Sequence, residues 1–179
     1  MELLLDRALR AGGVAASPGE ALVRSAGTHA VVSSPVDAQV AALLTSDGVA
    51  ADMFRARQLT AEILREPALV LTLTTTHRSA VVQTLPTALR RTFTLREFAR
   101  LVDHVDAAAL EAVRAETELV PRIKALVAAA QRARATAGPA LTQEDLDIAD
   151  PYRRADDVHA EVYAQITRSV ETVARALRN

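Results

Sequence analysis

The sequence has 179 residues, half of them apolar, which is enough to bury the core of one domain. Its 21 basic and 22 acidic residues are interspersed and leave a net charge of -1, so bulk electrostatics predicts neither nucleic acid nor an anionic membrane as partner. There is no cysteine, which excludes disulfides, thiolate zinc sites and a thiol nucleophile within these residues. No apolar run approaches the roughly 20 residues of a membrane-spanning helix, so we expect a soluble cytoplasmic protein.

The first part of the chain is expected to form a helix, a strand and a second helix. Apolar residues at helical spacing predict a helix over residues 1–10, which a Gly-Gly pair ends. Residues 21–26 have the composition of a short strand that ends in a turn. Pro35 suits the first position of the second helix, whose apolar face extends to Gly48.

The middle of the chain repeats this alternation. Thr60 is placed to cap a short helix, and the apolar run 69–73 suits a buried strand. A helix over 77–84, a strand over 91–95 and a helix over 96–102 follow. Strands that alternate with helices predict an α/β domain with a parallel sheet.

The remainder of the chain is expected to be helical. Within the stretch from about residue 103 to residue 146, residues 106–137 are Ala-rich and charged without strand signals, and Pro121 divides them into two expected helices. We interpret this stretch as a helical insertion in a single domain that spans residues 1–179. The last helix carries apolar residues at steps of three and four, which predicts a face turned to the core. These residues are Val158, Val162, Ile166, Val170, Val173 and Leu177.

The histidines give no sign of a metal site. His29, His77, His104 and His159 lie on different segments at no metal-ligand spacing, so we expect them at the surface or hydrogen-bonded. Ser25 has no nearby histidine base and no nucleophile-elbow context, which argues against a serine hydrolase.

Three short segments, in this order and spacing, resemble the low-molecular-weight protein tyrosine phosphatases, a family that includes related arsenate reductases. The segments are Ser25-Ala26-Gly27-Thr28, Ala56-Arg57-Gln58-Leu59-Thr60 and Asp150-Pro151-Tyr152. The resemblance implies a three-layer α/β fold and hydrolysis of phosphotyrosine through a phosphocysteine intermediate. It also implies that no metal or organic cofactor is needed.

The resemblance implies roles for three residues near the end of the chain. Asp150 would be the general acid that protonates the leaving tyrosyl oxygen, although an Asp before Pro is also typical of a turn cap. Tyr152 would line the cleft and stack on the substrate ring, where plain packing is the alternative. Arg153-Arg154 stands where many members carry a second aromatic, so Arg153 is expected to contact the substrate and to favour acidic peptides.

The family opens with a central buried strand that runs into a Cys-x5-Arg-[Ser/Thr] loop, and a helix follows. Residues 1–5 are similar to the start of that helix, so the strand, the cysteine and the arginine are expected to lie before residue 1. As it stands, the chain is therefore expected to be inactive, with the first strand of the sheet missing.

Three interpretations stay open. The natural protein is a complete phosphatase whose start codon is misplaced, or a non-catalytic binding or regulatory module, or a generic α/β interaction domain. An arsenate reductase relative is an alternative within the first. The partner implied for a restored loop is a phosphotyrosine protein or a phosphate-like anion. The incomplete sheet adds self-association as a possible outcome, because unpaired strand edges pair with other chains.

Overall fold

The computed structural model describes residues 1–13, 23–139, 142–150 and 156–178. Helices form most of this part of the chain, and none of them is long and apolar enough to cross a bilayer. In chain order the helices are α1 (Glu2–Ala11), α2 (Ala38–Ser46), α3 (Ala61–Arg65), α4 (Thr75–Thr84), the 3-10 helix η1 (Pro86–Arg91), α5 (Leu95–Asp103), α6 (Ala107–Ala115), α7 (Leu119–Ala133), α8 (Gln143–Leu146) and α9 (Asp156–Leu177).

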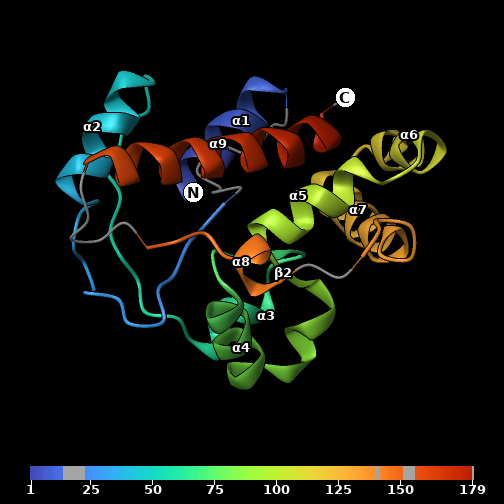
Figure 1. Cartoon of the computed structure of the whole chain (residues 1–179), viewed down its shortest axis with the longest axis horizontal. Coiled ribbons are helices and arrows are strands. Elements are labelled where there is room, and N and C mark those ends of the chain that lie inside the picture. The colour runs from blue at the N-terminus through green and yellow to red at the C-terminus, as the bar shows by residue number, and fades with distance from the viewer. Residues whose placement is uncertain (14–22, 140–141, 151–155, 179) are drawn as a thin grey trace.

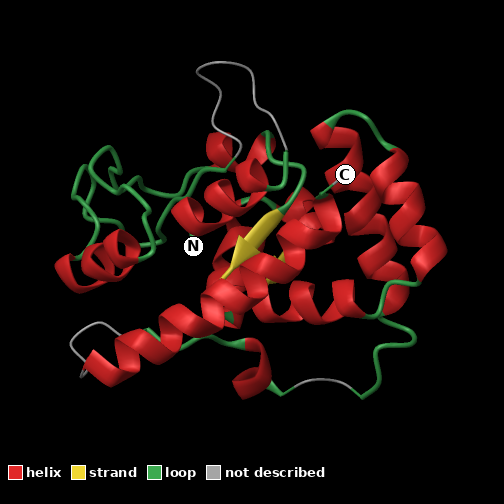
Figure 2. Cartoon of the chain, turned by 90° about the horizontal axis from the view of Figure 1, so that it is seen from above, coloured by secondary structure: helices red, strands yellow, loops and turns green. Residues whose placement is uncertain are grey.

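A two-stranded parallel sheet lies among these helices (Figure 2). Strand β1 (Val70–Thr72) pairs with strand β2 (Thr92–Thr94), and Leu71 stands opposite Phe93 in the register. The α/β class, the parallel sheet and the strands expected over 69–73 and 91–95 are therefore confirmed. The protein is a mostly helical α/β fold with a reduced sheet.

Helices cover both faces of the sheet. Side chains alternate along β1, so neighbouring residues of this strand pack against different core clusters. Leu71 packs against the main core cluster, which α1, α5 and α9 complete. Val70 packs against a second cluster around Leu64 and Val81, from α3 and α4. Figure 1 shows the same arrangement, with β2 between α3 and α4 on one side and α5 and α9 on the other.

Side-chain caps explain where several helices begin. The hydroxyl of Thr60 accepts from the amide of Ile63, and Thr74 and Thr94 cap α4 and α5 in the same way. The Gly-Gly pair ends α1 as expected, because Gly13 adopts a φ of 79°. Asp37, and not Pro35, starts α2: its carboxylate accepts from the amides of Gln39 and Val40.

The strand expected over residues 21–26 is wrong for the part that the structure describes. Residues 23–26 have no ladder, and only Gly27 forms an isolated parallel bridge, with Gln58. A strand exists only where a neighbour supplies hydrogen bonds to its backbone. No strand of the described chain lies beside this segment.

The two helices expected between residues 103 and 146 are confirmed as α6 and α7. Pro121 does not separate them: it lies in the first turn of α7, where proline is tolerated, and the break is at Glu116–Glu118. Val113 of α6 and Leu126 of α7 are buried in the main core cluster. That the stretch is an insertion relative to related proteins stays a prediction.

Candidate functional site

Two of the three phosphatase-like segments interlock through their backbones. The amide of Gly27 donates to the carbonyl of Arg57 at 2.8 Å, and the amide of Leu59 donates to the carbonyl of Gly27 at 2.9 Å. The guanidinium of Arg57 donates to the carbonyl of Ser25 at 2.8 Å. The side chain of Gln58 closes the pair by donating to the carbonyl of Thr28 at 2.9 Å. Segments 32 residues apart thus form one rigid loop pair.

This loop pair is attached to the beginning of α1. The hydroxyl of Ser25 donates to the carboxylate of Glu2 at 2.5 Å, and Glu2 lies in the first turn of α1. A hollow of about 210 Å³ opens beside it, lined by Glu2, Leu3, Ala50, Asp52, Met53 and Phe54. A helix N-terminus attracts anions, but here the first turn already carries a carboxylate.

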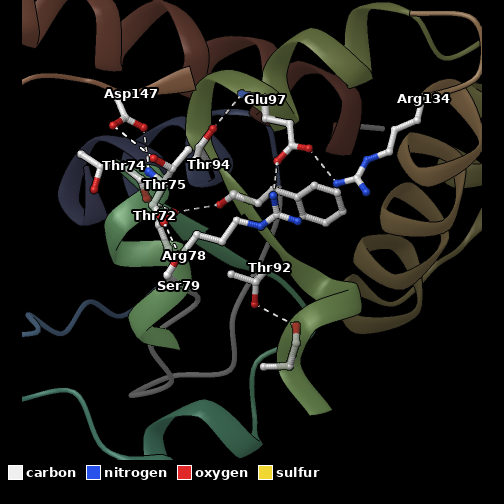
Figure 3. A network of polar contacts seen from close by, with 12 residues as sticks. Thr72, Thr74, Thr75, Arg78, Ser79, Thr92, Thr94, Glu97, Arg134 and Asp147 are labelled. Atoms are coloured by element: carbon white, nitrogen blue, oxygen red, sulfur yellow. Dashed lines mark hydrogen bonds and ion pairs between the residues drawn. The ribbon is translucent and has the colours of Figure 1, made fainter. Parts of the chain in front are cut away.

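Polar contacts organise the carboxyl ends of both strands (Figure 3). The hydroxyl of Thr72 donates to the carbonyls of Thr74 and Phe93, at 3.0 and 3.3 Å. The carboxylate of Asp147 accepts from the amide of Thr75 at 2.6 Å, at the start of α4. Figure 3 shows Asp147 next to Thr74 and Thr75, with its contacts to Thr75 as dashed lines.

Asp150 lies three residues after this anchor. The amide of Ile148 donates to the carbonyl of Leu73 at 2.8 Å, and the side chain of Ile148 is buried in the main core. Asp150 itself is exposed. The structure thus ties the segment before Asp150 to the end of β1, which is where ligands of parallel α/β sheets bind. Tyr152 and Arg153 lie outside the described residues.

Two of the carboxylates that build this region were missed by sequence reasoning. Glu2 gave only the signal of an acidic residue in a first helical turn, with nothing to pair it with Ser25. Asp147 gave none, because its partner is 72 residues away. Both depend on tertiary contacts that no local pattern encodes.

One histidine differs from expectation. His159 is 5% exposed, and neither ring nitrogen has a hydrogen-bond partner within the described part of the chain. It directly follows Val158, the first apolar residue of this face of α9, so the buried part of the helix includes a polar ring. Over the same residues, no group of three or more His, Asp or Glu side chains is arranged to hold a metal ion.

Comparison with known families decides the relationship. The sequence profile described as "Low molecular weight phosphotyrosine protein phosphatase" matches residues 2–133. The chain belongs to this family. The match includes the interlocked loop pair and confirms the resemblance, whereas residue 150 lies beyond it. No curated protein matches the chain.

Solved structures of phosphatases share the fold at low sequence identity. The tyrosine phosphatase AmsI of Erwinia amylovora is 19% identical, with a TM-score of 0.61 over 98% of this chain and 84% of that one. The tyrosine phosphatase Wzb of Escherichia coli K30, in complex with sulphate, is 18% identical, with a TM-score of 0.61 over 99% and 90%. The arginine phosphatase YwlE of Geobacillus stearothermophilus is 22% identical, with a TM-score of 0.61 over 98% and 84%.

Two facts bear on the family chemistry: the anions that relatives bind and the nucleophile that this sequence lacks. Relatives bind tetrahedral anions, as the sulphate complex and a phosphate complex of the Escherichia coli K30 protein indicate. In this family fold, the 179 residues contain no cysteine, so they lack a thiol nucleophile. The loop pair and the segment before Asp150 thus belong to a chain that has no thiol.

Proposed function

We propose that this chain is the body of a low-molecular-weight phosphotyrosine phosphatase-like domain, and that a polypeptide of these 179 residues does not hydrolyse phosphomonoesters. One observation carries the proposal: a family member without any cysteine. The family reaction forms a phosphocysteine, and this step needs the thiolate of a cysteine as its nucleophile. The serine of the loop pair cannot form a phosphocysteine, and its hydroxyl donates a hydrogen bond to the carboxylate of Glu2.

Asp150 is the proposed general acid of the completed site. Its exposure gives it access to solvent and ligand, and the anchors at Asp147 and Ile148 limit where the segment before it can move. A carboxyl group in this role protonates the leaving oxygen and then activates water. Tyr152 and Arg153 are proposed to contact the substrate.

The proposed ligand is a phosphotyrosine protein or a phosphate-like anion, bound once a cysteine- and arginine-bearing loop completes the site. Support comes from relatives whose structures hold sulphate, phosphate or benzylphosphonate. A cytoplasmic location and independence from metals and organic cofactors are parts of the same proposal. If no such loop belongs to the protein, the alternative is a non-catalytic binding or regulatory module of the same fold.

A para-nitrophenyl phosphate assay on two polypeptides tests the proposal: the 179-residue chain, and a chain extended by the codons that precede Met1 in its gene. We expect no turnover by the first. An extended chain that carries a Cys-x5-Arg loop should be active, and Asp150→Asn in it should lower kcat by about 10²- to 10⁴-fold. Turnover by the 179-residue chain would refute the proposal. Unchanged kcat in the Asp150→Asn variant would refute the role of Asp150 alone.

Self-association through the incomplete sheet is the proposed behaviour of the isolated chain. Support comes from β1, which pairs with β2 on one edge and with no strand of the described chain on the other. Open strand edges pair with other chains. Sedimentation at increasing concentration should reveal a reversible dimer, and a monomer at every concentration would contradict it.

A further inference from the structure

A groove runs along the contact between α1 and α9, away from the loop pair. Its volume is about 330 Å³, which lies at the lower end of the range for small-molecule sites. We name it the α1–α9 groove. It is lined by Leu4, Arg7, Ala8 and Ala11 from α1, and by Thr167, Val170, Glu171 and Arg178 from α9 and the residue just after it.

The groove combines an apolar floor with small side chains along its walls. Leu4 and Val170 are buried and form part of the main core cluster. Ala8 and Ala11 are small and stand one turn apart on α1, and the small side chain of Thr167 lines the groove from α9. Small residues at these positions leave a hollow that an apolar chain can occupy.

The charged residues of the groove favour an anion. Arg7 and Arg178 outnumber Glu171, so the lining carries a net charge of +1 at neutral pH. Arg7 already donates to the carbonyl of Asp47 at 2.5 Å. Arg178 is the unsatisfied group: its Nε is buried, and no residue of the described chain accepts a hydrogen bond from it.

The position of Arg178 is fixed by its surroundings. Its aliphatic stem passes so close to Gly12 that a Cβ at position 12 would lie 2.3 Å from Cγ of Arg178. Gly12 also ends α1, so the guanidinium stands near the negative end of the helix dipole, which stabilises the cation. The Nε–H itself is buried beside Gly12, but Arg178 lines the groove, and a carboxylate is the strongest acceptor for the other N–H groups of its guanidinium.

We propose that the α1–α9 groove binds a small amphiphilic anion, with its carboxylate on Arg178 and an unbranched apolar chain over Leu4 and Val170. This site is separate from the phosphatase-like scaffold and needs none of its residues. Failure of the proposed phosphatase-like function would therefore leave the groove untouched, and the reverse also holds.

Isothermal titration of the 179-residue chain with octanoate, and with octan-1-ol as the uncharged probe, tests the proposal. Octanoate should bind with one-to-one stoichiometry, and octan-1-ol at least about tenfold more weakly, since it lacks the charge-assisted hydrogen bond. The variant Arg178→Met keeps the apolar stem and should weaken octanoate binding about tenfold. The matched control is Arg175→Met, on an exposed position of α9, which should bind as the parent does.

A second variant protects the test against a change in folding. Ala11→Leu introduces a good helix former at an exposed position and fills the groove, so it should abolish octanoate binding while the helical circular dichroism is kept. Three outcomes would each overturn the proposal. The first is equal binding of octanoate and octan-1-ol, and the second is full octanoate binding by a folded Arg178→Met or Ala11→Leu variant. The third is no binding of octanoate at about 10 mM, which is weaker than ordinary ligand affinities.

Discussion

The two strands of the sheet have similar composition but very different surroundings. All three residues of β2 are fully buried, and Phe93 at its centre is 1% exposed. In β1 only Thr72 is buried, and Leu71, the partner of Phe93 in the register, is partly exposed. An isolated two-stranded sheet is only marginally stable in water, so the residues packed around each strand determine how much it contributes to stability.

Helices account for the burial of β2. Phe93 packs against Phe98 of α5 at a centroid distance of 5.0 Å, and the guanidinium of Arg134 lies 5.2 Å from the ring centroid of Phe93. The threonine hydroxyls are satisfied within the fold: Thr92 donates to the carbonyl of Ala88 at 2.8 Å. β1 is covered less completely, since Val70 and Leu71 are only partly buried. We therefore expect the stability of the fold to be concentrated on the β2 side.

The largest expected effect compares the two paired residues directly. Phe93→Ala should lower the free energy of unfolding by about 3 to 5 kcal/mol, because it empties a buried site. Leu71→Ala should cost only about 1 to 2 kcal/mol, below the usual range for a fully buried leucine, since part of the side chain is already in water. Urea unfolding measures both. Equal losses would show that β1 is as well supported as β2.

A smaller effect is expected from the ion pairs that join α5 to its neighbours. Glu97 is 15% exposed and lies 2.7 Å from Arg134 and 3.6 Å from Arg78, as Figure 3 shows. Glu97→Gln should destabilise the protein by about 1 to 2 kcal/mol, because it leaves two guanidinium groups without their carboxylate.

Glu62→Gln is the matched control for that variant. Its pair with Arg65 is 3.9 Å long and both side chains are mostly in solvent. The Glu62→Gln variant should unfold at the same urea concentration as the parent, because an exposed ion pair contributes little to stability. Similar losses in the two variants would mean that the ion pairs beside β2 contribute no more than an ordinary surface pair.

The smallest effect is expected far from the sheet, where α9 meets the end of α2. The hydroxyl of Tyr163 donates to the carboxylate of Asp47 at 2.7 Å. Partial burial, together with this hydrogen bond and the negative charge of Asp47, raises the pKa of Tyr163 to about 12. The folded state thus favours the neutral phenol, so the stabilisation is present below pH 10 and is lost as the pH rises through about 12.

An ultraviolet titration of tyrosinate should show one transition near pH 12 that Tyr163→Phe removes. The same variant should change the free energy of unfolding at pH 7 by less than about 1 kcal/mol. A transition near pH 10 for Tyr163 would contradict the contact with Asp47. The contrast between β1 and β2 would then remain the main feature of the protein's stability.

Local signals explain which elements the sequence predicted. The cap at Thr60, the glycine stop of α1 and the apolar runs of β1 and β2 each act within a few residues, so a single sequence contains them. The strand over 21–26 could not be decided in this way, because strand formation depends on a neighbour elsewhere in the chain. Pro121 shows the same limit, since proline suits a first turn as well as a break.

The candidate site was predictable only as motifs. The Ser25 and Arg57 segments were recognised from their residues, but their hydrogen bonds to each other and to Glu2 required the fold. The anchors of the Asp150 segment are similar: the contact of Asp147 with Thr75 joins residues 72 positions apart. Long-range pairs of this kind carry no sequence period.

The last helix completes the core that the others begin. α9 packs against α1, α2, α5, α6 and α7, and the buried guanidinium of Arg122 in α7 donates to the carbonyl of Leu177 at 2.9 Å. During translation the surfaces that those five helices turn to α9 have no cover until its 22 residues emerge, which takes roughly one to four seconds at ~5 to 20 residues per second. A nascent chain stalled before α9 should therefore be a client of ribosome-associated chaperones, and release of the full chain should free it.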